Sequence, residues 1–365
     1  MTKAGNGEGS IRSKPRADGR WEGRYHVEVG GVWKRRSVFG RTKAEAAKKL
    51  RDALSARDAG AHPAPAKETV STFLDTWLEG TRSSLRPRTY VSYSQIVRDH
   101  LKPTLGRIPL ARLQPHQVQQ LYSHLISSGR APKTVRNVHV TLHRALAQAQ
   151  RWRLVPTNVA DLIDPPRLSR REMKALSPEQ ARQVLDVARD DDLAALWTVA
   201  LTTGLRQGEL LALRWPDVDL DRRSLRVVAS LIRVVGQAPQ LVEPKSRRSR
   251  RQVELSRAAV DALRKHRAKD PSIGFVFARP DGRPLSVTTT WKRWRALLER
   301  AEVPPMAFHG ARHTAATLLL SRGVHPKIVS EMLGHSTVAI TLDVYSHVTP
   351  AMHREAANVM DHLLR

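Results

Sequence analysis

Two proline-containing breaks divide the 365-residue chain, and they constrain its fold more than any other feature. The first break is GAHPAPAK at residues 60–67, and the second is DPPRLSRREMKAL at residues 164–176. Proline neither continues a helix nor pairs within a central strand, so runs of this kind are typical of linkers. We therefore expect a multidomain, mainly α-helical protein with domains at residues 1–60, 66–168 and 174–365.

The first segment has the pattern of a small sheet followed by a helix. The runs RWEGRYHVEV and VWKRRSVFG have strand character and meet at Gly30 and Gly31, a dipeptide that suits a hairpin turn. Thr42 then precedes AEAAKKLRDALSARDA, a run rich in helix formers that it can cap. We expect a three-stranded sheet packed on one helix, an α+β arrangement.

The strands of this segment also carry four cations close to Trp21 and Trp33. A small sheet can lay such cations along DNA phosphates. The expected contacts are Arg24, Lys34, Arg35 and Arg36. The alternative is a solvated basic face that two core tryptophans hold on the helix, but the charge of the whole chain favours DNA contact.

The second segment predicts a compact helical domain. Its four apolar-periodic runs are TVSTFLDTWLEG, RPRTYVSYSQIVRDHL, PHQVQQLYSHLISSG and APKTVRNVHVTLHRALAQAQRW. Basic residues fall at predicted helix starts, where side-chain charge and free backbone N–H groups can act together on a phosphate. The expected contacts are Arg86, Arg88, Lys133 and Arg136, with plain solvated surface as the alternative.

The third segment is predicted to be mainly helical with one β-rich insert. Apolar β-branched runs in LRVVASLIRVVG and QLVEPKSRRSRRQVELS lie on the two sides of a polar, basic turn. This pattern indicates a small antiparallel sheet within a helical domain.

The charge balance predicts a polyanionic partner. The chain has 62 Lys and Arg residues against 34 Asp and Glu, a net charge of +28 that causes self-repulsion without a counter-charge. Nucleic acid is the expected partner. An anionic membrane surface and a compositional bias toward arginine are the competing explanations.

Other sequence features narrow the class of protein. The chain contains no cysteine, which excludes disulfides, zinc ribbons and thiol catalysis. It has no apolar run of the about 18 residues that a membrane span needs. Its first twenty residues lack the apolar region of a secretory signal. We therefore expect a cytoplasmic, nucleoid-associated protein without a membrane partner.

In the third segment, TTGLRQGELLALRW places Gly204 as an interruption of an apolar helix and Arg206 at the start of the next. Glu209, three residues further on, shares a helix face with Arg206. A surface ion pair is the simple explanation. At a helix start, however, Arg206 can present its planar fork to a phosphate while Glu209 holds the guanidinium.

Lys245 lies in EPKSRRSRR, at the basic turn of the β-rich insert. Such turns are usually just solvated. A lysine there can instead give a proton to a leaving oxygen if neighbouring cations lower its pKa. The arginines that supply this effect, and that are also expected to bind DNA, are Arg247, Arg248, Arg250 and Arg251.

The run FHGARHTAATLLL places His309 and Arg312 three residues apart at a helix start, so that both face the same way. His309 and His313 also have the spacing of a zincin metal site. That motif requires a Glu directly after the first His, where this chain has Gly310, and no third ligand is evident. We therefore expect no metal.

The final cluster, EMLGHSTVAITLDVYSHVTP, contains His335 after a glycine and then Tyr345. By itself, a tyrosine near a C-terminal helix is usually a packing residue with a hydrogen-bonded hydroxyl.

Taken together, these elements resemble the catalytic set of the tyrosine recombinases, the phage integrase family. The elements that match in order and approximate spacing are Arg206 in TGLRQGEL, Lys245 in the basic hairpin, His309-x-x-Arg312, His335 in LGH and Tyr345 in DVYSHV. The resemblance covers residues 174–365 closely. The two upstream segments are similar to the core-binding domain of that family and, more weakly, to its arm-binding domain.

The resemblance implies an enzyme that cuts and rejoins DNA through a 3′-phosphotyrosyl link to Tyr345. Arg206, Arg312 and His335 would surround the phosphate, with Glu209 supporting the first. His309 would act as the base and Lys245 as the acid. No cofactor, ATP or metal is required.

The expected partners are attachment-site DNA and three further copies of the chain, and an accessory factor for excision or DNA bending is a further candidate. The sheet at the N-terminus favours integration of a phage or mobile element. Two other functions remain open from the residues alone: a type IB topoisomerase-like enzyme that relaxes DNA, and a non-catalytic DNA-binding regulator.

Overall fold

The computed structural model describes residues 9–29, 32–58, 68–168, 174–233, 238–243, 250–269, 274–345, 360–361 and 364. The chain divides into two compact units, Met1–Ser169 and Arg170–Arg365. Their boundary lies within the second predicted linker. The division of the first unit at residues 60–66 stays a prediction.

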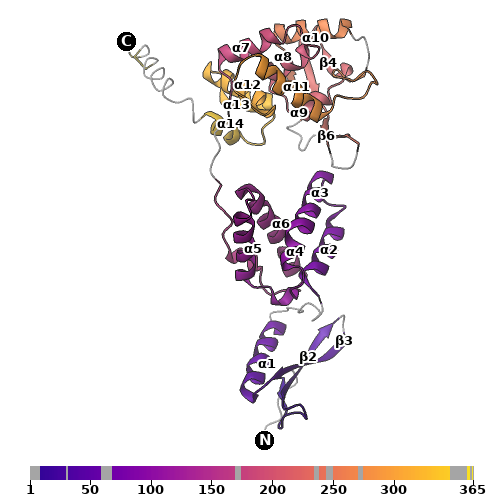
Figure 1. The fold of residues 1–365 in the computed structure, drawn as a ribbon, viewed down its shortest axis with the longest axis vertical. Helices are drawn as coiled ribbons and strands as arrows, with labels where there is room; N and C mark the ends of the chain where they lie inside the picture. Colours follow the sequence, from indigo (N-terminus) through magenta and orange to yellow (C-terminus); the bar gives the residue numbers. More distant parts are fainter. Residues whose placement is uncertain are drawn as a thin grey trace. The chain divides into compact units, whose positions relative to one another are not determined.

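The first unit begins with a three-stranded antiparallel sheet and a helix, as the sequence predicts (Figure 1). The strands pair in the order β1 (Ser10–Ile11), β2 (Trp21–Val29) and β3 (Val32–Gly40), and α1 (Lys43–Asp58) packs on β2 and β3.

The register of β2 and β3 divides the four predicted DNA-contacting cations between two faces of the sheet. Arg24 pairs with Ser37 and His26 with Arg35, whereas Tyr25 pairs with Arg36 and Val27 with Lys34. Successive side chains alternate between faces. Lys34 and Arg36 therefore share the face of Gly23, against which Leu50 of α1 packs. Arg24 and Arg35 lie on the opposite face, which we call the open face, although Lys34 and Arg36 are exposed as well.

Glu22 also lies on the open face, where it is 5% exposed and forms ion pairs with three arginines. Glu22 accepts a hydrogen bond from Arg24 at 3.0 Å, and Arg12 and Arg16 lie at 3.8 Å. Hydrogen bonds from Arg24 and Ser37 lower the pKa of Glu22 to about 2. Trp33 is 62% exposed, so it is not the core tryptophan of the alternative explanation.

The rest of the first unit is helical, with the predicted second helix interrupted by a π-helical turn. The elements are α2 (Val70–Thr81), α3 (Pro87–Ile96), the turn η1 (Val97–Leu101), α4 (Lys102–Leu105), α5 (Pro115–Ser127) and α6 (Pro132–Arg151), with short 3-10 turns η2 (Leu110–Arg112) and η3 (Val159–Leu162). Their core contains Phe73, Trp77, Leu101, Leu121 and Leu142.

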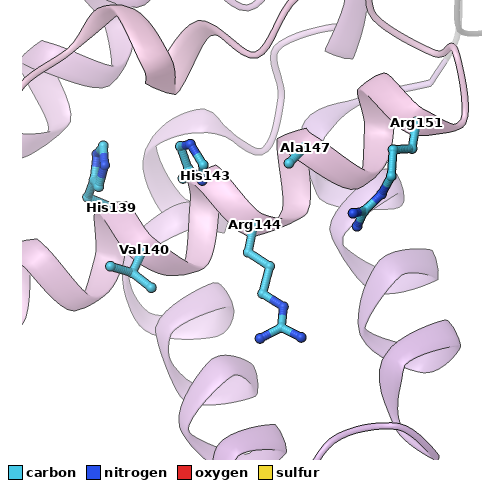
Figure 2. Close-up of a pocket in the computed structure, with 6 residues that line it drawn as sticks. All are labelled: His139, Val140, His143, Arg144, Ala147 and Arg151. Carbon is cyan, nitrogen blue, oxygen red and sulfur yellow. The ribbon is translucent and has the colours of Figure 1, made fainter.

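The predicted phosphate contacts of this region do lie at helix starts and are exposed. Arg86 precedes α3 and Arg88 lies in its first turn, while Lys133 lies in the first turn of α6 and Arg136 at the start of its second turn. Further along α6, side chains from successive turns of the helix line a hollow (Figure 2). They are His139, Val140, His143, Arg144, Ala147 and Arg151.

The second unit is mainly helical, and its β-rich insert forms two small sheets instead of the one that we expected. β4 (Val218–Asp219), β5 (Ser224–Val227) and β8 (Arg251–Glu254) make the first, and β6 (Ser230–Ile232) and β7 (Gln240–Val242) the second. The helices are α7 (Pro178–Val187), α8 (Ala194–Thr203), α9 (Gln207–Leu211), α10 (Arg257–Lys269), α11 (Val287–Arg300), α12 (His309–Ser321), α13 (Pro326–Leu333) and α14 (Val338–Tyr345), and η4 (Trp215–Asp217) is a 3-10 turn.

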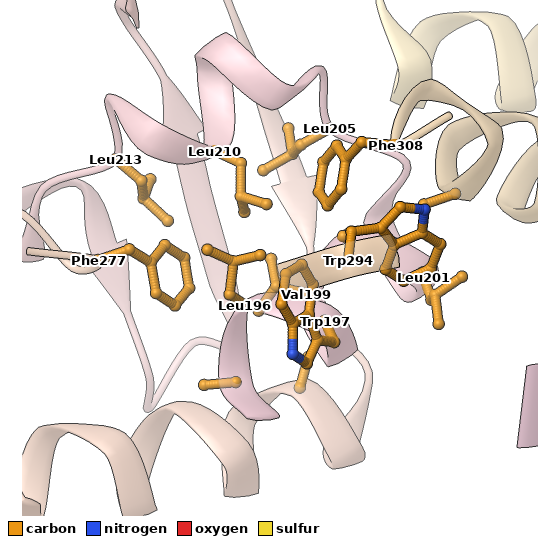
Figure 3. Packing of buried hydrophobic residues seen from close by; sticks show 14 of the residues in the cluster. Leu196, Trp197, Val199, Leu201, Leu205, Leu210, Leu213, Phe277, Trp294 and Phe308 are labelled. Atoms are coloured by element: carbon orange, nitrogen blue, oxygen red, sulfur yellow. The ribbon is translucent and has the colours of Figure 1, made fainter. Parts of the chain in front are cut away.

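Helix α8 lies at the centre of this unit because it is apolar on every side, and α7, α9, α10 and α12 pack around it. Its Trp197 meets Trp294 of α11 at 5.6 Å and Phe308 at 6.0 Å between ring centroids (Figure 3). All three rings are buried. The active-site helices α9 and α12 are thus built on one rigid core. In the described part of the chain, no helix has the length and apolarity to cross a membrane.

Trp294→Ala should lower the free energy of unfolding of the second unit by about 3–5 kcal/mol, because it leaves a cavity beside Trp197 and Phe308. Trp291→Ala, on the same helix but 44% exposed, is the matched control and should lose about 1 kcal/mol or less. Urea unfolding followed by circular dichroism measures both. Equal losses would contradict this account of the core.

Candidate active site

A left-handed glycine brings the arginines of the site together. Helix α8 ends at Thr203, and Gly204 follows with φ of +63°. A Cβ at Gly204 would collide with the side chain of Leu333, so glycine is required both by conformation and by space. The carbonyl of Gly204 accepts a hydrogen bond from Nη1 of Arg312 at 2.9 Å, and Arg206 follows two residues later. The turn therefore joins the start of α9 to α12.

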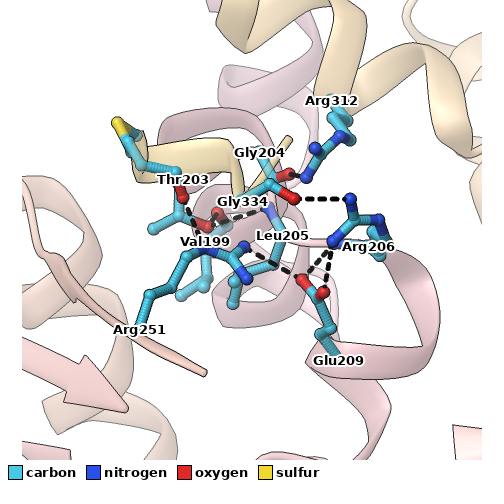
Figure 4. A network of polar contacts seen from close by, with 10 residues as sticks. Val199, Thr203, Gly204, Leu205, Arg206, Glu209, Arg251, Arg312 and Gly334 are labelled. Carbon is cyan, nitrogen blue, oxygen red and sulfur yellow. Dashed lines mark hydrogen bonds and ion pairs between the residues drawn. The ribbon is translucent and has the colours of Figure 1, made fainter. Parts of the chain in front are cut away.

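Arg206 is held on two sides by the protein (Figure 4). Its Nη1 donates to Oε1 of Glu209 at 2.7 Å, and its Nη2 donates to the carbonyl of Gly334 at 2.9 Å. The backbone N–H of Arg206 donates to Oε2 of Glu209 at 3.1 Å. The expected pair of Arg206 and Glu209 is therefore present. Because 37% of the Arg206 side chain is exposed, the guanidinium also reaches solvent.

The carboxylate of Glu209 is buried between two arginines. Only 4% of its side chain is exposed, and Oε2 accepts a hydrogen bond from Nη2 of Arg251 at 3.0 Å. Burial by itself would raise the pKa of Glu209. The charges and hydrogen bonds of Arg251 and Arg206 outweigh burial, so this pKa lies below its usual value and the carboxylate is ionised.

Arg312 is a buried cation with spare hydrogen-bonding capacity. The residue is 3% exposed, and its Nη2 has no hydrogen-bond partner among the described residues. Burial, with the nearby charge of Arg206, lowers the pKa of Arg312 to about 9. An arginine in this state is stabilised by any anion that reaches it.

His309 opens α12, one turn before Arg312. Its ring meets that of His313 edge-on at 4.8 Å between centroids. Although His309 retains contact with solvent, partial desolvation and the charges of Arg312 and Arg206 lower its pKa. Among the described residues, no group of three or more His, Cys, Asp or Glu side chains is arranged to hold a metal ion.

His335 is placed by a second left-handed glycine. Gly334, with φ of +69°, ends α13, and Nδ1 of His335 then lies 2.8 Å from the hydroxyl oxygen of Thr341 on α14. Burial and the charges of Arg312 and Arg206 lower the pKa of His335 to about 4. The structure thus brings Arg206, Arg312 and His335 into one cationic site.

Two predicted catalytic side chains are not among those described. The backbone of Tyr345 ends α14, which packs on α12 and α13, but its side chain lies outside the described part of the structure. Lys245, Arg247 and Arg248 belong to residues 244–249, which also lie outside it.

Comparison with known families agrees with this geometry. Residues 174–352 match the model of the phage integrase family, and residues 69–126 match the N-terminal SAM-like domain of phage integrases. The tyrosine recombinase XerC-like protein of Caldanaerobacter subterraneus subsp. tengcongensis is 30% identical over 359 residues, which cover 90% of this chain and 92% of that protein. The chain belongs to the phage integrase family of tyrosine recombinases. It is an enzyme that cleaves and rejoins DNA through a tyrosine intermediate.

Solved integrase structures share the fold of this tyrosine recombinase. The Tn1549 transposon integrase, in complex with a circular intermediate DNA, matches with a TM-score of 0.71 and 22% identity, over 80% of this chain and 99% of that one. A lambda integrase, from a tetramer bound to a Holliday junction, matches with a TM-score of 0.60 and 17% identity, over 94% and 96% of the two chains. The mainly helical fold with small sheets is therefore confirmed.

The recombinase site contains one residue that the sequence analysis misplaced. Arg251, predicted to bind DNA beside Arg250, has a side chain only 7% exposed and contacts Glu209 instead. The strand pattern carried the signal. Side chains two residues apart in a strand point to the same face, and Val253 and Leu255, two and four residues after Arg251, are both buried. We expected the whole basic run to bind DNA and missed this alternation.

The unfolding free energy of the second unit should fall as the pH is lowered from about 7 to 5. Folding lowers the pKa values of His313 and His335 to about 4, below the ordinary 6.5. The unfolded chain therefore binds more protons in this window, and acid favours unfolding. His335→Asn and His313→Asn should each flatten the pH dependence of urea unfolding. A unit that gains stability between pH 7 and 5 would contradict the assignment.

Proposed function

We propose that this tyrosine recombinase is the integrase of a phage or mobile element, and that it cleaves DNA at the site formed by Arg206, Arg312 and His335. The observation that carries the proposal is the Nη2 of the buried Arg312, which lies near Arg206 and has no hydrogen-bond partner within the part of the chain that the structure describes. Two neighbouring guanidinium groups can form a receptor for a phosphodiester, since arginine stays protonated and donates bidentately.

The cations would act most strongly in the transition state. A DNA phosphodiester is anionic and resists attack, and negative charge grows on its non-bridging oxygens as the pentavalent state forms. Donors already fixed by Glu209, Gly204 and Gly334 need little reorganisation to meet that charge. The approach of the phosphate also offsets the like-charge repulsion between Arg206 and Arg312.

The cleavage step would use a nucleophile, a base and an acid from this chain. The phenol oxygen of Tyr345 attacks phosphorus while the bond from phosphorus to the 5′ oxygen breaks. His309 accepts the phenol proton, and Lys245 gives a proton to the departing oxygen. The products are a 3′-phosphotyrosyl enzyme and a free 5′-hydroxyl. Because the ester is conserved, a 5′-hydroxyl from another duplex can reverse the step without ATP.

The same proposal includes contacts outside the catalytic unit. The open face of the N-terminal sheet, with Arg24 and Arg35, would bind arm sites. In the helical region, the cations at the starts of α3 and α6 would bind the core sites; they are Arg86, Arg88, Lys133 and Arg136. Arg247 and Arg248 would add phosphate contacts near the cleaved bond.

Recombination joins two duplexes, so we propose a homotetramer on DNA, as in the lambda integrase complex with a Holliday junction. Assembly of such a complex separates this function from that of a topoisomerase-like enzyme, which acts alone. An accessory factor that bends DNA or directs excision would join the same complex.

Tyr345→Phe should abolish covalent protein–DNA adducts while DNA affinity stays close to that of the wild type, because only the nucleophilic oxygen is removed. The measurement uses a nicked suicide duplex with the flanking DNA of the element, followed by denaturing electrophoresis. Arg206→Ala is the companion variant, and its cleavage rate should fall by several orders of magnitude. Adducts that persist in Tyr345→Phe would rule out this nucleophile.

Arg35→Gln should weaken binding to arm-site DNA and reduce the magnitude of the salt slope by about 0.9, the value for one lost phosphate contact. Lys34→Gln removes the same charge from the neighbouring residue, which is also exposed but lies on the face against which α1 packs, and should change the slope less. Binding titrations of the full chain over a range of salt concentrations compare the two. Equal slopes in the two variants would refute an open-face interface.

A further inference from the structure

Arg251 is a buried cation with no role in the chemistry proposed above. It begins β8, and its side chain is 93% removed from solvent. An arginine loses favourable hydration when it is buried, so its partners must replace that hydration. The partners of Arg251 belong to two other elements of the site.

The Arg251 guanidinium joins β8 to α9 and to the end of α13 (Figure 4). Its Nη2 donates to Oε2 of Glu209 at 3.0 Å, and its Nε donates to the carbonyl of Met332 at 2.6 Å. The guanidinium also packs closely on Gly334, where an added Cβ would lie 2.9 Å from Nη1. Arg251 therefore contacts Glu209 and Gly334, the two groups that hold Arg206 in the phosphate site.

Glu209 and Gly334 both contact Arg206, a cation of the proposed catalytic site. Glu209 binds Arg206 through its other oxygen, and Gly334 both accepts from Arg206 and immediately precedes His335. Without Arg251, the Glu209 carboxylate would keep one cationic partner instead of two, and the carbonyl of Met332 would lose a donor. Arg206 and His335 would then be free to shift away from their positions.

We propose that Arg251 is a positioning residue of the recombinase, which acts through Glu209 on Arg206 and through the Met332–Gly334 turn on His335. The proposal rests on the proposed function of that site. It assigns to Arg251 no contact with DNA, unlike the other arginines of the same basic run.

The first test measures single-turnover cleavage of the suicide duplex by the full chain. Arg251→Gln should cleave about a hundredfold more slowly, the order of loss that follows a displacement of about 1 Å in a catalytic group. Its DNA affinity and salt slope should match those of the wild type. A salt slope reduced by about 0.9 would show a phosphate contact and overturn the proposal, as would wild-type cleavage.

The matched control is Arg226→Gln on the adjacent strand β5. Arg226 pairs across the sheet with Gln252, next to Arg251, but its side chain is 63% exposed. The control removes the same charge from the same sheet without touching Glu209, so cleavage should stay within about twofold of the wild-type rate. An equal loss of cleavage rate in both variants would show that the effect comes only from the lost positive charge and not from positioning.

A conservative variant decides the question if Arg251→Gln does not fold. Lysine keeps the charge, but a single ammonium group cannot reproduce the planar donor pair that meets Glu209 and Met332. Folded Arg251→Lys should therefore still cleave about tenfold more slowly at unchanged DNA affinity. Wild-type cleavage by that folded variant would overturn the proposal.

Two further measurements separate positioning from general structural support. If Arg251 acts through Glu209, its replacement should cost much less in a Glu209→Gln background, whereas full additivity would count against the proposal. A substrate with sulfur in place of the 5′ bridging oxygen needs no acid to release its leaving group. The slow cleavage by Arg251→Gln should persist on that substrate. Recovery of the wild-type rate would mean that Arg251 supports the proton donor instead.

These outcomes stay distinct from a failure of the proposed function itself. If the site does not cleave DNA through Tyr345, the wild-type chain forms no Tyr345-dependent adduct on either substrate. If only the role of Arg251 is wrong, the wild type forms that adduct and the variant matches it.

Discussion

The Glu209 carboxylate is the interaction on which the rest of the site depends. It is buried at the start of α9, and it meets one arginine with each oxygen, Arg206 on Oε1 and Arg251 on Oε2. A charge so far from water is stable only when it is paired and hydrogen-bonded. The pairing in turn sets the plane of the Arg206 guanidinium, and Arg206 and Arg251 both reach the end of α13, so α9, β8 and α13 form one frame.

The residues of this site carry an excess of positive charge that a DNA phosphate would offset. Within the described part of the site, Arg206, Arg312 and Arg251 face a single carboxylate, and burial together with the repulsion between these charges lowers the pKa values of Arg312 and His335. The core around Trp197 opposes that repulsion by holding α8 and α12 in place. A phosphate would supply the missing negative charge, so the architecture of the free enzyme already favours its substrate.

Much of this could be predicted from local pattern. The hairpin, the helix starts and the Arg206–Glu209 pair follow from interactions between residues close in the chain, which periodicity and turn chemistry report well. The errors came from contacts between distant residues. The single predicted sheet became two, and Arg251 was assigned to the surface, because composition does not show which residue of a basic run the strand alternation turns inward.

The sequence by itself therefore determined the element types, the basic charge and the residues eligible for catalysis, since each depends on neighbours along the chain. Tertiary structure decided which of those residues meet. The turns at Gly204 and Gly334 bring Arg206, Arg312 and His335 together from α9, α12 and the end of α13, and the β2–β3 register separates Arg35 from Lys34. Contacts of this kind join residues that are far apart in the sequence. They depend on how the helices and strands pack, which no short stretch of sequence specifies.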